Sequence, residues 1–226
     1  MELQLRPARP SDHADIVATI FSAFETHPIH ARLFPRDLGA SHEFWESYVS
    51  KELQDPNARF IIAEDVSSTS ASPSSDNLTT STFVAFALWK PPVTENSSLT
   101  SAPAPPPDWS AWPANPALAA AFFGAIGGKH TTIMGDRLHF YLELICCRPE
   151  FMGNGAGGLM MRWGLEQADA GGFETYLDAT PSGKPLYDKN GFRTLEVVKY
   201  LDGACEHYFM IRDPKTAAEK STCTTL

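Results

Sequence analysis

Hydrophobic and polar positions along the chain predict strands and helices in turn. Period-two alternation and short apolar runs are typical of strands, and apolar residues three and four positions apart form one face of a helix. The segments with a strand pattern are 2–8, 59–66, 82–90 and 138–147. Helix patterns begin after Pro10 and after Gly158, and two more cover residues 44–53 and 118–134. Segments 59–66 and 82–90 are expected to pair as a hairpin.

Three other segments lack a regular pattern over some or all of their length. Residues 67–82 are rich in Ser and Thr and are expected to be an insertion between two strands. Residues 91–135 begin with a Pro-rich loop that contains Trp109 and Trp112, and they end in an apolar helix. Residues 213–226 are polar and are expected to form a flexible tail. We therefore predict a single domain over 1–212.

Composition narrows the class of protein and the kind of partner. The chain has 226 residues, of which 43% are hydrophobic and 20% charged, which is enough for one well-packed core. Its net charge of −9 argues against non-specific binding to nucleic acid and mildly favours a cationic substrate such as an amine. The oligomeric state stays open between a monomer and a homodimer.

Cysteines and apolar runs add expectations about metal, membrane and compartment. Adjacent Cys146 and Cys147 point to opposite faces of a strand, which makes a disulfide between them unfavourable. The four cysteines and seven histidines show no metal-ligand spacing, so no metal site is expected. Neither a signal peptide nor a membrane-spanning run is visible, and we expect a cytoplasmic protein that does not enter membranes.

A glycine-rich stretch between the strand at 138–147 and the next helix carries the strongest functional signal. Gly153, Gly155, Gly157 and Gly158 leave the backbone accessible where a helix begins, and N–H groups at a helix N-terminus bind phosphate. A Walker loop needs Gly-Lys-Ser or Gly-Lys-Thr, which is absent. A dinucleotide-binding pattern can be imposed on residues 153–158, with Asp178 as its acidic ribose ligand about 20 residues on.

A third interpretation fits better. Residues 148–159, Arg-Pro-Glu-Phe-Met-Gly-Asn-Gly-Ala-Gly-Gly-Leu, resemble the acyl-CoA pyrophosphate loop of the GNAT acetyltransferase superfamily. Gly155 and Gly157 match its glycine positions, whereas Met152 stands where that family has Gln or Arg. Residues 176–192 resemble the family's later signature, in which a short helix carries a tyrosine, here Tyr187, before a Gly-Phe turn. The resemblance covers 1–212, most sharply 138–192.

The resemblance implies a fold and a cofactor. The fold would be an α/β (α+β mixed-sheet) GNAT fold, with a mostly antiparallel central sheet splayed between its fourth and fifth strands and flanked by helices. The cofactor would be acetyl-CoA. Its pantetheine arm would meet backbone groups of Ile145, Cys146, Cys147 and Arg148. Its pyrophosphate would meet residues of the loop: Met152, Gly153, Asn154, Gly155, Ala156, Gly157 and Gly158.

The implied reaction is direct transfer of an acetyl group to the amine of a small molecule. Tyr187 matches the tyrosine that protonates the departing sulfur. Glu143 is a costly carboxylate in an apolar run, and burial would raise its pKa toward that of a useful base. His139, about 13 Å away on the same strand face, is the other candidate base. Two alternatives are a GNAT-like module that binds acyl-CoA without turnover and a dinucleotide-dependent oxidoreductase.

Overall fold

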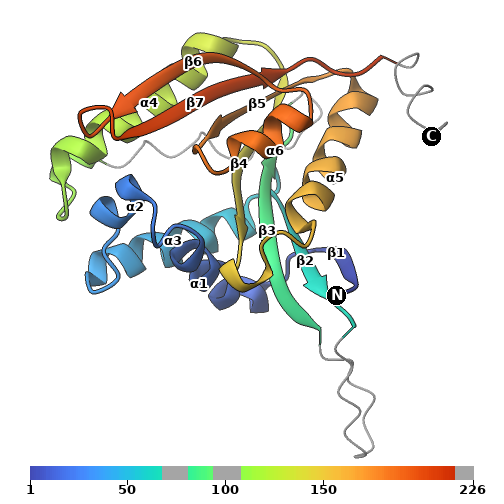
Figure 1. Cartoon of the computed structure of the whole chain (residues 1–226), viewed down its shortest axis with the longest axis horizontal. Helices are drawn as coiled ribbons and strands as arrows, with labels where there is room; N and C mark the ends of the chain where they lie inside the picture. The colour runs from blue at the N-terminus through green and yellow to red at the C-terminus, as the bar shows by residue number, and fades with distance from the viewer. Residues whose placement is uncertain (68–80, 94–107, 217–226) are drawn as a thin grey trace, which may run out of the picture.

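The computed structural model describes residues 1–67, 81–93 and 108–216. Seven strands form one mixed sheet in the order β1-β2-β3-β4-β5-β7-β6 (Figure 1). The strands are β1 (Leu3–Pro7), β2 (Arg59–Asp65), β3 (Thr82–Lys90), β4 (His139–Cys147), β5 (Glu174–Ala179), β6 (Arg193–Tyr200) and β7 (Cys205–Arg212). The α-helices are α1 (His13–Ala23), α2 (Pro28–Leu33), α3 (Gly39–Gln54), α4 (Pro116–Met134), α5 (Ala156–Gly171) and α6 (Lys184–Lys189). Short 3-10 turns are η1 (Pro10–Asp12), η2 (Trp109–Ala111) and η3 (Pro149–Phe151).

Strand directions divide the sheet into two halves. Strands β1 to β4 are antiparallel neighbours in chain order, and β5, β7 and β6 are antiparallel as well. The halves meet where β4 runs parallel to β5, and this register ends at the pair Leu142–Leu177. Beyond that pair β4 continues to Cys147 without β5 beside it. The expected splay between the fourth and fifth strands is therefore confirmed, and the parallel doubly wound sheet that a dinucleotide fold requires is not formed.

Helices cover both faces of the sheet because β3 and β4 bury side chains on both faces. Phe86 and Leu88 pack into the core formed with α1, α2 and α3. Ala87 and Trp89, on the opposite face of β3, pack into the core formed with α5 and α6. In Figure 1, α1 to α3 lie on one side of β4, and α5 and α6 lie on the other.

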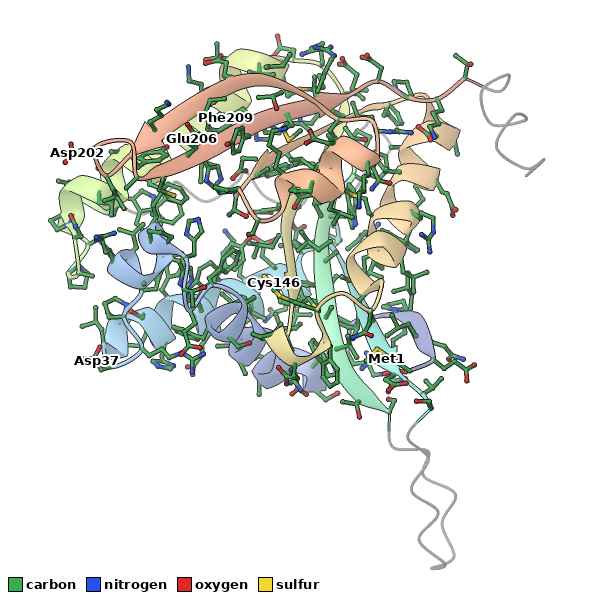
Figure 2. The ribbon with its side chains drawn as sticks, viewed as in Figure 1. Met1, Asp37, Cys146, Asp202, Glu206 and Phe209 are labelled. Carbon is green, nitrogen blue, oxygen red and sulfur yellow. The ribbon has the colours of Figure 1, made fainter. Side chains whose placement is uncertain are left out.

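The approach of α5 to the sheet depends on a glycine. A Cβ added at Gly164 would lie 2.2 Å from the Trp89 ring, so a side chain at this position is excluded by the indole. The adjacent cysteines of β4 also follow the pleat. Cys146 lies in the α1–α3 core near the middle of the molecule (Figure 2), whereas Cys147 packs against the α5 core, and both are free thiols.

Most predicted elements are present, and two were not foreseen: the short helix α2 and the last strand β7. Much of the predicted insertion 67–82, part of the segment 91–135 and the end of the tail 213–226 lie outside the described residues. Within the described ranges, no helix is both long and apolar enough to cross a membrane, and no group of His, Cys, Asp and Glu suited to a metal ion occurs.

Candidate active site

A cavity of about 1180 Å³ occupies the space that the splay opens between the half-sheets. On one side it is lined by the glycine-rich loop and α6, and on the other by α2, α3, η2 and α4. The strand β4 passes between these sides and contributes Tyr141 to Cys147. Because the β5 register stops at Leu177, the edge of β4 that faces away from β3 has no paired strand over 143–147 in the described chain. A cleft of this kind holds a ligand beside unpaired backbone groups.

The glycine-rich loop presents a helix N-terminus to the cavity. Gly155 is the N-cap of α5 with φ of +90°, and Gly153 has φ of +81°. The N-cap makes no side-chain hydrogen bond, and the first intrahelical bond of α5 runs from Leu159 N–H to the Gly155 carbonyl. The N–H groups of Ala156, Gly157 and Gly158 therefore point outward with the positive end of the helix dipole, which is the geometry of an anion site.

The other predicted cofactor residues divide into two groups. Ile145, Cys146, Cys147, Met152, Gly153, Gly155, Ala156 and Gly157 line the cavity. Asn154 lies outside the lining and holds the loop together, because its side-chain amide donates to the Phe151 carbonyl at 3.1 Å. The Arg148 N–H donates to the Val84 carbonyl at 3.0 Å. The Arg148 guanidinium turns to Asp15 at 2.6 Å, so neither group of Arg148 is directed to the cavity.

Tyr187 lies on α6 and is 5% exposed, with its ring against Phe192. It lines the cavity on the side of the glycine-rich loop. Burial and the nearby Asp178 charge raise the pKa of its hydroxyl above the ordinary tyrosine range, which keeps the hydroxyl protonated at neutral pH. No hydrogen bond joins this hydroxyl to another described residue.

Glu143 is held by an irregularity in β4. The β3–β4 register passes from Leu88–Leu144 to Trp89–Leu142, so Glu143 is an extra residue without a partner on β3. Bulges of this kind redirect a side chain, and Glu143 lines the cavity near the Tyr48 hydroxyl of α3. Burial raises the pKa of the Glu143 carboxyl, while the Lys90 charge and the Tyr48 hydroxyl act in the opposite direction. The result is a half-buried carboxylate in the cavity with a raised pKa.

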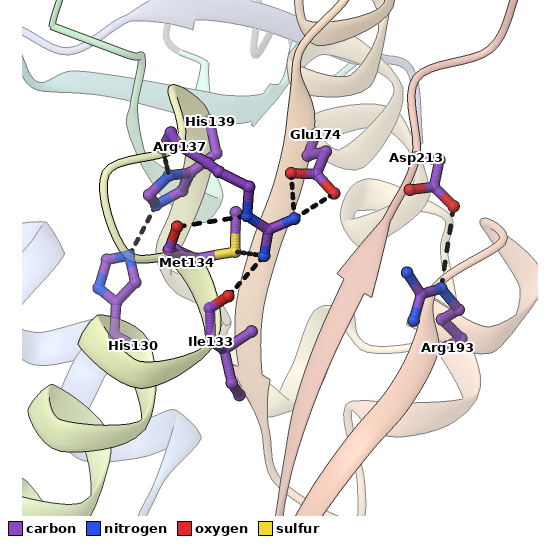
Figure 3. Close-up of polar contacts among 8 residues, drawn as sticks. All are labelled: His130, Ile133, Met134, Arg137, His139, Glu174, Arg193 and Asp213. Carbon is purple, nitrogen blue, oxygen red and sulfur yellow. Dashed lines mark hydrogen bonds and ion pairs between the residues drawn. The ribbon is translucent and has the colours of Figure 1, made fainter.

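His139 is not brought to the cavity. Its Nδ1 lies 2.6 Å from the Arg137 carbonyl and its Nε2 lies 2.7 Å from Nε2 of His130 (Figure 3). Burial lowers the pKa of His139. Figure 3 also shows that the Arg137 guanidinium donates hydrogen bonds to both carboxylate oxygens of Glu174, at the start of β5. The period-two pattern predicts His139 on the face of Glu143. In the structure, His139 is the first residue of β4, where this strand is still paired with β5.

A carboxylate that the motifs did not assign to this chemistry also lines the cavity. Asp178, at the end of β5, accepts a hydrogen bond from the Tyr141 hydroxyl at 3.1 Å and pairs with His207 Nε2 at 2.7 Å. The sequence offered Asp178 only as a ribose ligand in the dinucleotide interpretation. No local signal identified the cluster, because its members come from β4, β5 and β7.

Comparisons with known proteins bear on the fold. The sequence matches no protein-family model and no curated protein. A histone acetyltransferase HPA2-related acetyltransferase from Corynebacterium glutamicum is 20% identical, with a TM-score of 0.58 over 96% of this chain and 98% of its own. Arylalkylamine N-acetyltransferase 2 from Aedes aegypti is 13% identical, with a TM-score of 0.66 over 95% of this chain and 100% of its own. A GNAT-family acetyltransferase from Streptococcus pneumoniae is 17% identical, with a TM-score of 0.51 over 95% and 100%. The chain therefore has the fold of the GNAT acetyltransferases.

Proposed function

We propose that this protein transfers an acetyl group directly from acetyl-CoA to the amine of a small molecule. One observation carries the proposal: a single cavity joins the uncapped N-terminus of α5 to the Tyr187 hydroxyl and the Glu143 carboxyl. The first of these features suits a phosphorylated cofactor. The other two are the proton donor and proton acceptor that acyl transfer to an amine requires.

The cofactor binds in two parts. The N–H groups of 156–158 hold its pyrophosphate, since they are unpaired within the helix and carry the positive end of the helix dipole. The pantetheine arm lies along the open edge of β4 over 143–147 and pairs with backbone groups there, as an added strand would. Arg148 takes no part, because its N–H is already bonded to Val84.

The acceptor nitrogen loses two protons in the reaction, and the sulfur gains one. Glu143 takes the first proton from the acceptor ammonium, which its raised pKa favours, and later releases it to solvent. The neutral amine attacks the thioester carbonyl and forms a tetrahedral intermediate. The carbon–sulfur bond then breaks, and Tyr187 gives its proton to the departing sulfur. The nitrogen loses its second proton as the intermediate collapses, which restores the proton of Tyr187, and the products are an N-acetylated amine and CoA.

Two further parts of the proposal have separate support. The Aedes aegypti neighbour is named for acetyl transfer to arylalkylamines, which supports a small-molecule acceptor in this fold. The cysteines in the described ranges are free thiols, which suits a reducing compartment such as the cytoplasm. A binding module without turnover is the second candidate, because Met152 lacks the polar group that the family has at this position.

A thiol-release assay with acetyl-CoA and a panel of primary amines tests the proposal. The wild type is expected to release CoA only when an amine is present. For Glu143→Gln, the decline in rate toward acid pH should shift or disappear, because the wild-type rate rises with pH as Glu143 loses its proton. The difference between the two proteins should shrink as pH rises, because a free amine also loses its proton in solution. Binding of acetyl-CoA with no release for any amine would instead establish the module without turnover.

A further inference from the structure

The cavity has an aromatic wall opposite the glycine-rich loop. We use this name for a set of six rings that all line the cavity: Phe34, Phe44, Trp45, Tyr48, Trp109 and Phe123. The rings form one continuous series of contacts. Phe44 lies 5.1 Å from Phe34 and 5.3 Å from Trp109, measured between ring centroids. Trp109 stacks on Phe123 at 3.8 Å. Rings packed in this way present a large, rigid apolar surface.

The aromatic wall begins at the candidate base. The Tyr48 hydroxyl and Glu143 both line the cavity and lie near each other, and the Tyr48 ring lies 5.6 Å from Trp45 and 6.2 Å from Phe44. An amine whose nitrogen is at Glu143 therefore directs its substituent along these rings. Only a short linker is needed between the amine and a substituent that contacts the aromatic wall, because Tyr48 belongs to this wall and also lies near Glu143.

The charges in the cavity favour an acceptor with a single ammonium group. The carboxylates in the lining, as far as the described chain shows, are Glu52, Glu143 and Asp178. Glu52 is paired with Lys90, and Asp178 is held by Tyr141 and His207. Glu143 remains to receive the reacting amine, so a second cationic group on the acceptor would be desolvated without an uncommitted carboxylate as partner.

Histidines beside the aromatic wall do not add charge. Burial lowers the pKa of His27 to about 4 and that of His30 to about 3. Both rings are therefore neutral at neutral pH, and His30 stacks on Trp45 at 5.8 Å as a further flat surface. This end of the cavity suits an uncharged aromatic group.

We infer that the acceptor is a primary amine joined by a short chain to an aromatic ring, and that Trp109 and Phe44 determine this preference. The inference rests on the proposed function and specifies its acceptor. Trp109 is contributed by η2, which packs on α4, and α4 itself contributes Phe123. The segment that the sequence predicts as a loop plus helix thus supplies part of the acceptor site.

A comparison of three probe amines as acceptors tests the inference. Phenethylamine, propylamine and spermidine are compared by kcat/KM in the thiol-release assay. We expect phenethylamine to exceed propylamine by about 10- to 100-fold, in the range that apolar pocket contacts provide. Trp109→Leu should reduce this ratio by about tenfold, since stacked rings contribute beyond their area. Trp163→Leu is the matched control, because Trp163 packs on the α5 core and does not line the cavity. Its ratio should equal that of the wild type.

Calorimetric titration of phenethylamine into the CoA-saturated protein separates this inference from the proposed function. Binding without turnover supports the aromatic site and refutes acetyl transfer. Turnover of propylamine or spermidine at rates equal to or above that of phenethylamine overturns the inference and leaves the proposed function standing. If phenethylamine is neither bound nor turned over, the inference and the proposed function are both overturned. A ratio that falls equally in Trp109→Leu and Trp163→Leu shows a general loss of packing and also overturns the inference.

Discussion

Charge at position 152 should control the affinity for CoA. Met152 is 57% exposed, follows η3 directly, and lines the cavity near the N–H groups that are unpaired at the start of α5. A longer polar side chain there has room without displacing a neighbour. We therefore expect CoA affinity to decrease in the order Met152→Arg, Met152→Gln, wild type and Met152→Glu.

The exposure of this side chain sets the size of the effect. Two unit charges 4 Å apart interact by about 1 kcal/mol in water and about 4 kcal/mol near a protein surface. A site more than half open to solvent belongs near the lower value, so we expect about 1–2 kcal/mol for Arg. This corresponds to about 5- to 30-fold tighter binding. Gln adds one neutral hydrogen bond, about 0.5–1.5 kcal/mol, and Glu should weaken binding by about as much as Arg strengthens it.

Isothermal titration of CoA into the four proteins measures this order. The spread between Arg and Glu should shrink at high salt, because the screening length falls from about 10 Å at 0.1 M to about 3 Å at 1 M. The Gln effect should be nearly independent of salt, which makes Met152→Gln the internal control. Equal CoA affinities for the Arg and Glu variants would refute the reasoning and place the pyrophosphate away from this loop.

Three further predictions concern catalysis, pH and packing. Tyr187→Phe should lower kcat by about 10²–10⁴ with the Kd for CoA nearly unchanged, and a wild-type kcat would show that the tyrosine only packs. Burial holds the pKa of His30 at about 3 against an ordinary 6.5, so its contribution to stability is complete above pH 6.5 and is lost as pH falls toward 3. In urea unfolding, the free energy of unfolding should therefore fall by about 2 kcal/mol less in His30→Phe than in the wild type when the pH is lowered from about 7.5 to about 5. An identical decrease in the two proteins would contradict the buried neutral ring. Gly164→Ala should destabilise the protein by about 1–3 kcal/mol because the added Cβ meets Trp89 at 2.2 Å. Gly127→Ala, with open space around it, should stabilise it by about 0.5–1 kcal/mol, and a loss of stability there would contradict this account.

The sequence predicted the parts of the site that depend on short-range order. The strand, glycine-rich loop and helix over 138–171 are contiguous, so periodicity and glycine spacing are enough to identify them. Gly155 is the N-cap residue of α5 and has no capping side chain, and Tyr187 lies on a short helix. Both placements agree with the motifs that indicated them. Glu143 is predicted as a site residue because a carboxylate in an apolar run is costly, and it lies in the lining of the cavity.

The remaining parts depend on contacts that periodicity does not encode. Asp178 and His207 are 29 positions apart in the sequence, and they meet because β5 pairs with β7. The aromatic wall combines Phe34, directly after α2, with rings from α3, η2 and α4. Helical periodicity predicts α3 and α4, but it does not show that their rings line one cavity. Alternation places His139 on the face of Glu143 and so predicts it as a base, but alternation cannot show where β5 leaves β4.

The short junction between β4 and β5 also bears on how the protein folds. Paired residues of β2 and β3 lie closer together in the chain than Phe140 and Thr175, which pair across the junction. Pairings that close longer loops form later. We expect pulse-labelled amides of Phe140 and Thr175, a pair at this junction, to gain protection after those of β2 and β3. Simultaneous protection would contradict this order. The proposed cofactor cleft would then be completed only after β2 and β3 have paired, and a chain interrupted between these steps would have this hairpin without the cleft.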